Sequence, residues 1–216
     1  MKKLILSATI ASLVSSSAFA VLITTPADPI LGVQLQGSVI AVAPQGEING
    51  QNSTPGSGNE NAQFSIDGSN GTKYLNFGKT NTGIIVDASD DLLILTGIEL
   101  ITGGDAPERD PATFSIYGTT VSQSVTFSDY TLIVADQAIL GTDPGRGLTS
   151  GLITFTNPSN APFDSYLVIF PTVRDSGAAN SMQVSEIRLD GTVPEPTTFA
   201  LLGLAAVGLA ARRRRA

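Results

Sequence analysis

The sequence contains no cysteine, no histidine and no tryptophan. Without cysteine the chain forms no disulfide, no thiolate metal site and no cysteine nucleophile. Without histidine it lacks the usual general base near neutral pH, the usual zinc ligand and every Ser-His-Asp triad. Any enzyme built from this chain would depend on carboxylates, Tyr, Lys or Arg, so we expect a protein that is not an enzyme.

Positive charge is scarce between residues 21 and 192, where 18 Asp and Glu stand against 6 Lys and Arg, a net charge of −12. The other cationic residues lie at the two ends of the chain. Such an acidic body repels phosphate backbones, so we expect no binding to nucleic acid. An acidic surface keeps an exported protein soluble, and it is also compatible with divalent cation binding.

The N-terminus has the composition of a secretory signal peptide. Two lysines precede a short, mostly apolar run, and the small residues Ala18 and Ala20 follow it. This order of charge, apolar run and small residues predicts cleavage by signal peptidase after Ala20. We therefore expect residues 1–20 to be removed on export.

Three parts follow one another at the C-terminus: Pro-Glu-Pro at 194–196, an apolar stretch at 197–211 and an arginine cluster at 212–215. The prolines stop a helix from propagating back into the preceding domain. The apolar stretch can enter a bilayer as a helix, with the arginines on the cytoplasmic side. Its 15 residues span only about 22 Å, which is short for a hydrocarbon core of about 30 Å. The segment therefore suits temporary membrane residence better than permanent anchoring.

This tail at 193–216 resembles the PEP-CTERM sorting signal, which exosortase recognises in Gram-negative bacteria that make exopolysaccharide. The resemblance implies transient residence in the inner membrane, processing near Pro-Glu-Pro, and delivery to the cell surface or extracellular matrix. A plain tail anchor would explain the helix and the arginines but not the Pro-Glu-Pro. The residues that match the recognition elements of the family are Pro194, Glu195, Pro196, Arg212, Arg213, Arg214 and Arg215.

Between residues 21 and 192, short apolar or alternating runs are separated by Gly, Asn, Asp, Ser and Pro. This pattern is typical of an all-β fold, and we expect one β-sandwich or jelly roll flanked by the signal peptide and the C-terminal hydrophobic helix. The apolar alternation slips between Val184 and Ile187, which predicts a β-bulge. The expected strands are 33–42, 73–77, 83–87, 92–102, 113–117, 130–135, 152–156, 165–170 and 182–189.

Residues 61–74 read NAQFSIDGSNGTKY and resemble the A-x-D-G-x-x-x-T-x-W loop of discoidin-like (coagulation factor 5/8 C-type) domains. Tyr74 stands where that family more often has Trp, which keeps an aromatic plug. Residues 106–118 and 182–189 are similar to later motifs of the same family. The resemblance implies a galactose-binding-like jelly roll whose end loops bind carbohydrate, such as an extracellular polysaccharide, or another extracellular partner.

The loop around Asp67 carries oxygen ligands of the kind that Ca²⁺ prefers. Asp67 offers a carboxylate, while Ser69 and Thr72 offer carbonyl or hydroxyl oxygens. In the resembled family a Glu on the last strand often completes such a site, and Glu186 matches that position. The expectation is a structural Ca²⁺ held by these four residues; the alternative is an Asp-Gly turn that binds no metal.

Two further acidic clusters have alternative interpretations. Glu108, Arg109 and Asp110 lie between two prolines. This segment is either a loop that contacts a ligand or a rigid turn in which Arg109 pairs with a nearby carboxylate. The adjacent carboxylates at 90–91 are interpreted as a charged turn rather than a catalytic pair. Two neighbours in one turn cannot lie on opposite sides of a glycosidic bond, as glycoside hydrolysis requires. A non-catalytic binding protein is thus favoured over a purely structural surface protein and over a carboxylate-based hydrolase.

Overall fold

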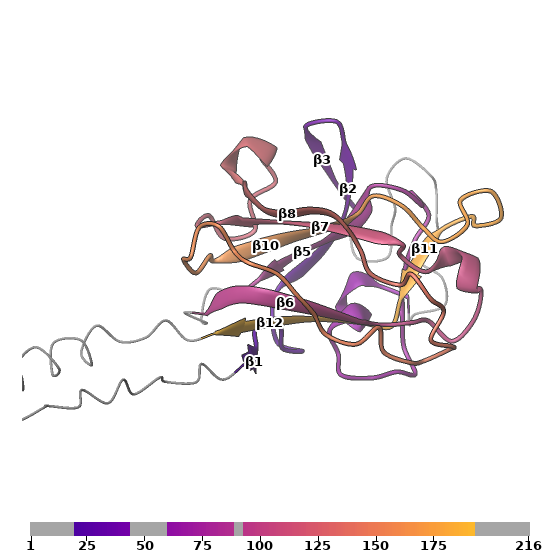
Figure 1. The fold of residues 1–216 in the computed structure, drawn as a ribbon. Coiled ribbons are helices and arrows are strands. Elements are labelled where there is room, and N and C mark those ends of the chain that lie inside the picture. The colour runs from indigo at the N-terminus through magenta and orange to yellow at the C-terminus, as the bar shows by residue number, and fades with distance from the viewer. Residues whose placement is uncertain (1–19, 44–59, 89–92, 193–216) are drawn as a thin grey trace, which may run out of the picture.

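The computed structural model describes residues 20–43, 60–88 and 93–192, and this part of the chain is built from short strands and three single-turn 3₁₀ helices (Figure 1). The helices are η1 (Ala62–Ser65), η2 (Pro107–Arg109) and η3 (Phe127–Asp129). The strands are β1 (Ala20–Leu22), β2 (Ile30–Gln36), β3 (Val39–Ala43), β4 (Tyr74–Asn76), β5 (Thr82–Asp87), β6 (Ile94–Ile101), β7 (Thr113–Thr119), β8 (Thr131–Ala138), β9 (Ile153–Thr154), β10 (Ser165–Phe170), β11 (Met182–Val184) and β12 (Glu186–Thr192).

Two antiparallel sheets lie face to face as a sandwich (Figure 1). The smaller sheet has the strand order β1-β12-β6-β9, and the larger has the order β3-β2-β5-β10-β7-β8. A separate two-stranded ladder, β11-β4, lies beside them. None of the described helices is long and apolar enough to cross a membrane. The prediction of an all-β sandwich is confirmed.

The larger sheet is buried on both faces at its centre, which explains the unbroken apolar runs of β5 and β10. Inward-facing side chains such as Ile84 and Val168 join the main core between the sheets. Outward-facing Ile85 and Leu167 join a second apolar cluster on the other face. Close approach of these two strands requires Gly83, because a Cβ there would overlap the carbonyl oxygen of Val168.

Strand β12 runs along the sandwich and distinguishes its two ends. Its last residue, Thr192, pairs with Ala20 on one side and with Ile94 on the other. We call the end of the sandwich where these residues meet the tether end. It also includes the loop 120–130, which follows β7, and the loop 155–164, which precedes β10. At the opposite edge, here called the pocket end, β12 begins beside the segments 60–73, 102–112 and 171–181.

Two details of the strand prediction are wrong. The expected single strand 33–42 is the hairpin β2–β3, because the chain reverses at Gly37, whose φ of 63° is a left-handed value that glycine adopts at no steric cost. The expected bulge near Val184 is a change of sheet: β11 pairs with β4, whereas β12 pairs with β6 from Glu186 onward. The apolar alternation slips there because the two segments face different neighbours.

Candidate functional site

The Asp67 loop follows η1 and is closed by its own side chains. Asp67 Oδ1 accepts the backbone N–H of Ser69 (2.9 Å), and Asp67 Oδ2 accepts the hydroxyl of Thr72 (2.7 Å). Gly68 has a φ of 78°, so the turn uses a left-handed position that favours glycine. The D-G-x-x-x-T spacing therefore places a carboxylate and a hydroxyl against each other within one tight loop.

Glu186, the first residue of β12, reaches this loop from 117 positions away in the sequence. Its Oε1 accepts the backbone N–H of Ser69 (3.0 Å), and the residue is only 2% exposed. Burial, followed by the hydrogen bond and negative charge of Asp67, raises the pKa of Glu186 from 4.5 to about 7. The backbone N–H groups of Ser69 and Gly68 oppose this rise only in part.

The arrangement fits the oxygen chemistry of a calcium ion. Two carboxylates, of Asp67 and Glu186, face each other with the Thr72 hydroxyl bonded to one of them. Ser69 presents its N–H to both carboxylates, its carbonyl oxygen to Thr72, and its Oγ to Gly71 N–H. Within the described residues no three Asp, Glu, His or Cys side chains are placed to hold one metal ion, so hydroxyl and carbonyl oxygens would have to complete a cation site.

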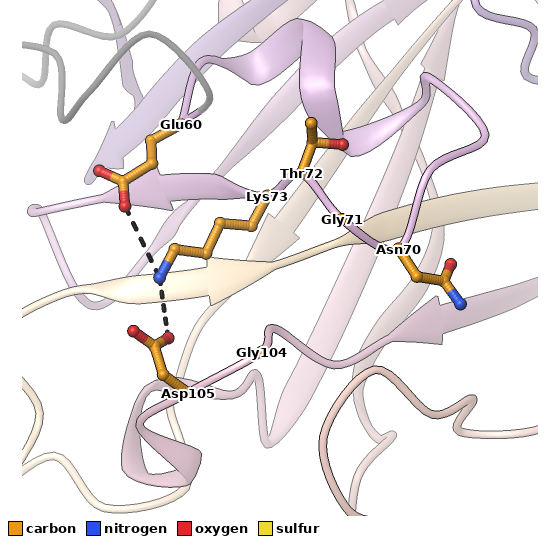
Figure 2. Close-up of a pocket in the computed structure, with 7 residues that line it drawn as sticks. All are labelled: Glu60, Asn70, Gly71, Thr72, Lys73, Gly104 and Asp105. Atoms are coloured by element: carbon orange, nitrogen blue, oxygen red, sulfur yellow. Dashed lines mark hydrogen bonds and ion pairs between the residues drawn. The ribbon is translucent and has the colours of Figure 1, made fainter.

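Beside this loop lies a polar pocket of about 370 Å³ at the pocket end (Figure 2). At its centre, Lys73 Nζ lies between Glu60 Oε1 (3.6 Å) and Asp105 Oδ1 (2.8 Å), and it also donates to Gln183 Oε1 (3.3 Å). Lys73 lowers the pKa of Asp105, chiefly through this hydrogen bond. The lining residues are Glu60, Asn70, Gly71, Thr72, Lys73, Gly104 and Asp105.

The sequence interpretation missed this pocket. Lys73 lies inside the recognised loop motif, but its partners are scattered from Glu60 to Gln183, and no local spacing links them. Figure 2 shows the amine of Lys73 directed between the carboxylates of Glu60 and Asp105, while Asn70 and Thr72 form the other side. Only the meeting of segments 60–73 and 103–105 at one edge creates the site.

The segment 106–111 supports the pocket from behind. Asp110 is fully buried and receives a bidentate contact from Arg146, at 3.0 and 2.6 Å. Arg146 also donates to the carbonyl oxygens of Gly103 (3.4 Å) and Asp105 (3.2 Å), so it ties the loop after β6 to the buried carboxylate. Arg174 lies 3.8 Å from the same carboxylate, whereas the charge of Arg109 acts on Asp105 and helps to lower its pKa.

Most of the residues expected at the chain ends lie outside the described residues: Ala18, Pro194, Glu195, Pro196, Arg212, Arg213, Arg214 and Arg215. The carboxylates at 90–91 also lie outside them. Ala20 is the first described residue and opens strand β1. Cleavage after it would leave Val21 and Leu22 paired with β12.

Comparison with known proteins identifies the tail and the fold separately. Residues 192–215 match the PEP-CTERM protein-sorting motif, which marks an exported protein anchored transiently at the membrane and processed by exosortase. No curated protein sequence matches the chain. The sandwich is similar to CpGH89CBM32-5 from Clostridium perfringens, solved in complex with GalNAc-β-1,3-galactose: TM-score 0.51 and 10% identity, over 78% of this chain and 99% of that one.

Two further structures have the same overall similarity. The family 32 carbohydrate-binding module of NanJ from Clostridium perfringens, in complex with galactose, gives a TM-score of 0.49 at 12% identity, over 80% of this chain and 99% of that one. Chitosan-binding module 1 of a chitosanase/glucanase from Paenibacillus sp. IK-5 gives 0.47 at 16%, over 78% and 97%. At such low identity the likeness concerns the fold alone, and the CpGH89CBM32-5 structure, with its TM-score of 0.51, agrees with the expected β-sandwich.

Proposed function

We propose that this chain is a cell-surface or matrix protein of a Gram-negative bacterium whose non-catalytic β-sandwich binds carbohydrate in the Lys73 pocket. Signal peptidase removes residues 1–20, and exosortase processes the tail near Pro-Glu-Pro. The pocket itself carries the proposal: carboxylates of Glu60 and Asp105, the Lys73 amine and the Asn70 amide converge on one concavity at the pocket end.

The pocket has the chemistry of hydroxyl recognition. A sugar hydroxyl both donates and accepts hydrogen bonds, and the lining offers carboxylate acceptors together with ammonium and amide donors. Its volume of about 370 Å³ lies at the lower end of the usual range of small-ligand sites, about 300–1,000 Å³. Since no aromatic side chain is among the described residues that line it, affinity depends on hydrogen bonds rather than on ring stacking.

Charge narrows the class of polysaccharide. The body from 21 to 192 has a net charge of −12, and two carboxylates flank the single amine at the centre of the pocket. An acidic polysaccharide would be repelled by this field, whereas a neutral or amino-sugar polymer would not. The ligand we propose is therefore neutral or cationic.

A structural calcium ion at Asp67, Thr72 and Glu186, with an oxygen of Ser69, is part of the same proposal. The loop that would hold the ion also supplies Asn70 and Thr72 to the pocket. When bound, the ion would neutralise the two facing carboxylates. The residues that hold the ion would then keep the Asp67 loop in one conformation, with Asn70 and Thr72 facing the ligand.

Catalysis by this carboxylate pair is disfavoured by its geometry. Asp67 and Glu186 share a hydrogen bond, so their carboxyl groups lie next to each other. Glycoside hydrolysis needs two carboxyl groups about 5 Å or more apart, on opposite sides of the scissile bond. The pair suits a cation better than a sugar ring.

Binding to a glycan array, followed by calorimetry with the best neutral and amino-sugar polymers, tests the proposal. Asp105→Asn should abolish binding, because it replaces one carboxylate oxygen by an amide donor and removes the negative charge that pairs with Lys73. Asp136→Asn is the matched control, since Asp136 lies on β8 with a φ of 47° that Asn tolerates. No binding by the native protein to any glycan would overturn the proposal and favour a purely structural surface protein.

A further inference from the structure

Both ends of the described body leave the sandwich at the same edge. Ala20 pairs with Thr192, Val21 with Gly191 and Leu22 with Asp190, so the first and last strands lie side by side. The sorting motif begins at residue 192, the final residue of that ladder. The membrane connection therefore starts at the tether end, without any intervening domain.

The connection is short compared with the sandwich. Only four residues, 193–196, separate Thr192 from the apolar stretch that begins at Thr197. Even a fully extended chain reaches at most about 18 Å from Thr192 to Thr197. Strand β12 alone, from Glu186 to Thr192, spans about 20 Å. The pocket end therefore cannot turn onto the bilayer while the tail is inserted. In that orientation the distance from Thr192 to the bilayer would exceed the length of the connection.

The two described loops of the tether end offer apolar side chains and no cation to a lipid surface, and they also carry Asp129 and Asp164. Its loop after β7 exposes Val121 and Val125, each at 49%. The cations of the body gather elsewhere: Arg146 contacts the 103–105 loop, and Lys79 donates to the carbonyl oxygen of Ser176. Because the described loops 120–130 and 155–164 contain no Lys or Arg, anionic headgroups contribute little attraction there.

We infer that, until the tail is removed, the tether end rests against the surface of the bilayer that holds the tail, and the pocket end points away from it. The partner is the lipid surface itself. The short connection holds the tether end close to the bilayer, and the exposed Val121 and Val125 contact the lipid. It holds whether or not the pocket binds a sugar, and it leaves the pocket open to ligands beyond the membrane.

The absence of cysteine makes a direct test simple, since each variant carries a single thiol. Thr156→Cys, in the loop 155–164, and Ala178→Cys, in the segment 171–181, place exposed thiols at the tether end and the pocket end. The full chain, tail included, is labelled with an environment-sensitive fluorophore and reconstituted in phosphatidylcholine vesicles that contain nitroxide lipids. Quenching is expected at Thr156→Cys and not at Ala178→Cys, with the same difference when phosphatidylglycerol is added.

A second variant tests the physical cause. A flexible Gly-Ser insertion between Thr192 and Val193 lengthens the connection and should abolish the difference between the two positions. Near-ultraviolet circular dichroism of each labelled protein establishes that the sandwich is folded. Equal quenching at both positions in the native-length chain, or stronger quenching at Ala178→Cys, would overturn the inference. Glycan binding by the same vesicles tests the proposed function separately.

Discussion

Glu186, buried beside Asp67, makes stability depend on pH in a direction opposite to that of ordinary acidic residues. The pKa of Glu186 rises from 4.5 to about 7 in the folded protein. At about 1.4 kcal/mol for each pKa unit, this rise corresponds to about 3 kcal/mol of preference for the protonated form.

The sign follows from proton linkage. The folded state binds this proton more tightly than the unfolded chain does, so the contribution is fully present below about pH 4.5 and is lost as the pH rises through about 7. In a calcium-free buffer, the free energy of unfolding should therefore fall by up to about 3 kcal/mol between about pH 4.5 and pH 8. For a domain of this size, that is a fall in Tm of about 6–12 °C.

Thermal unfolding in the presence of a chelator, followed by circular dichroism, measures this effect. Glu186→Gln cannot ionise and should remove this part of the pH dependence, whereas Glu108→Gln on η2 should keep it. At about pH 8, calcium at 100 times its Kd should raise the free energy of unfolding of the native protein by about 2.7 kcal/mol. The rise in Tm should be much smaller in Glu186→Gln. An identical pH slope in the native protein and Glu186→Gln would refute the reasoning.

Other substitutions probe the pocket, its support and the core. Lys73→Met should abolish glycan binding in the calorimeter while leaving Tm within a few degrees, because its ion pairs are partly exposed. Arg146→Met should lower the free energy of unfolding, measured in urea, by about 3 kcal/mol, since it leaves the buried carboxylate of Asp110 without its bidentate partner. Adding Asp110→Asn should restore part of this loss. An unchanged urea midpoint in Arg146→Met would contradict the role given to this pair. Gly83→Ala should cost about 3 kcal/mol or more, because the new methyl group meets a backbone carbonyl across β5 and β10. Tyr74→Phe should cost about 1–2 kcal/mol, as it removes the phenol that bonds Asn76 and the Gly83 carbonyl, and an equal or higher urea midpoint would show that these bonds contribute nothing.

The linear order of residues was sufficient for the tail and for most of the strands. A sorting motif is read along the chain, and the match at 192–215 needs no fold. Alternation of apolar side chains is likewise local, so β7 and β10 could be placed within a residue or two. The loop motif around Asp67 agreed with the β-sandwich and correctly placed Glu186 on the last strand.

What the pattern could not supply is which distant groups meet. Apolar alternation is the same for a strand that pairs with β4 and one that pairs with β6, so the change of sheet after Val184 looked like a bulge. The placement of Lys73 between Glu60 and Asp105 depends on loops from different strands arriving at one edge. So does the choice of Arg146 as the partner of Asp110. Such contacts come from the long-range packing of the two sheets, and local spacing carries no information about them.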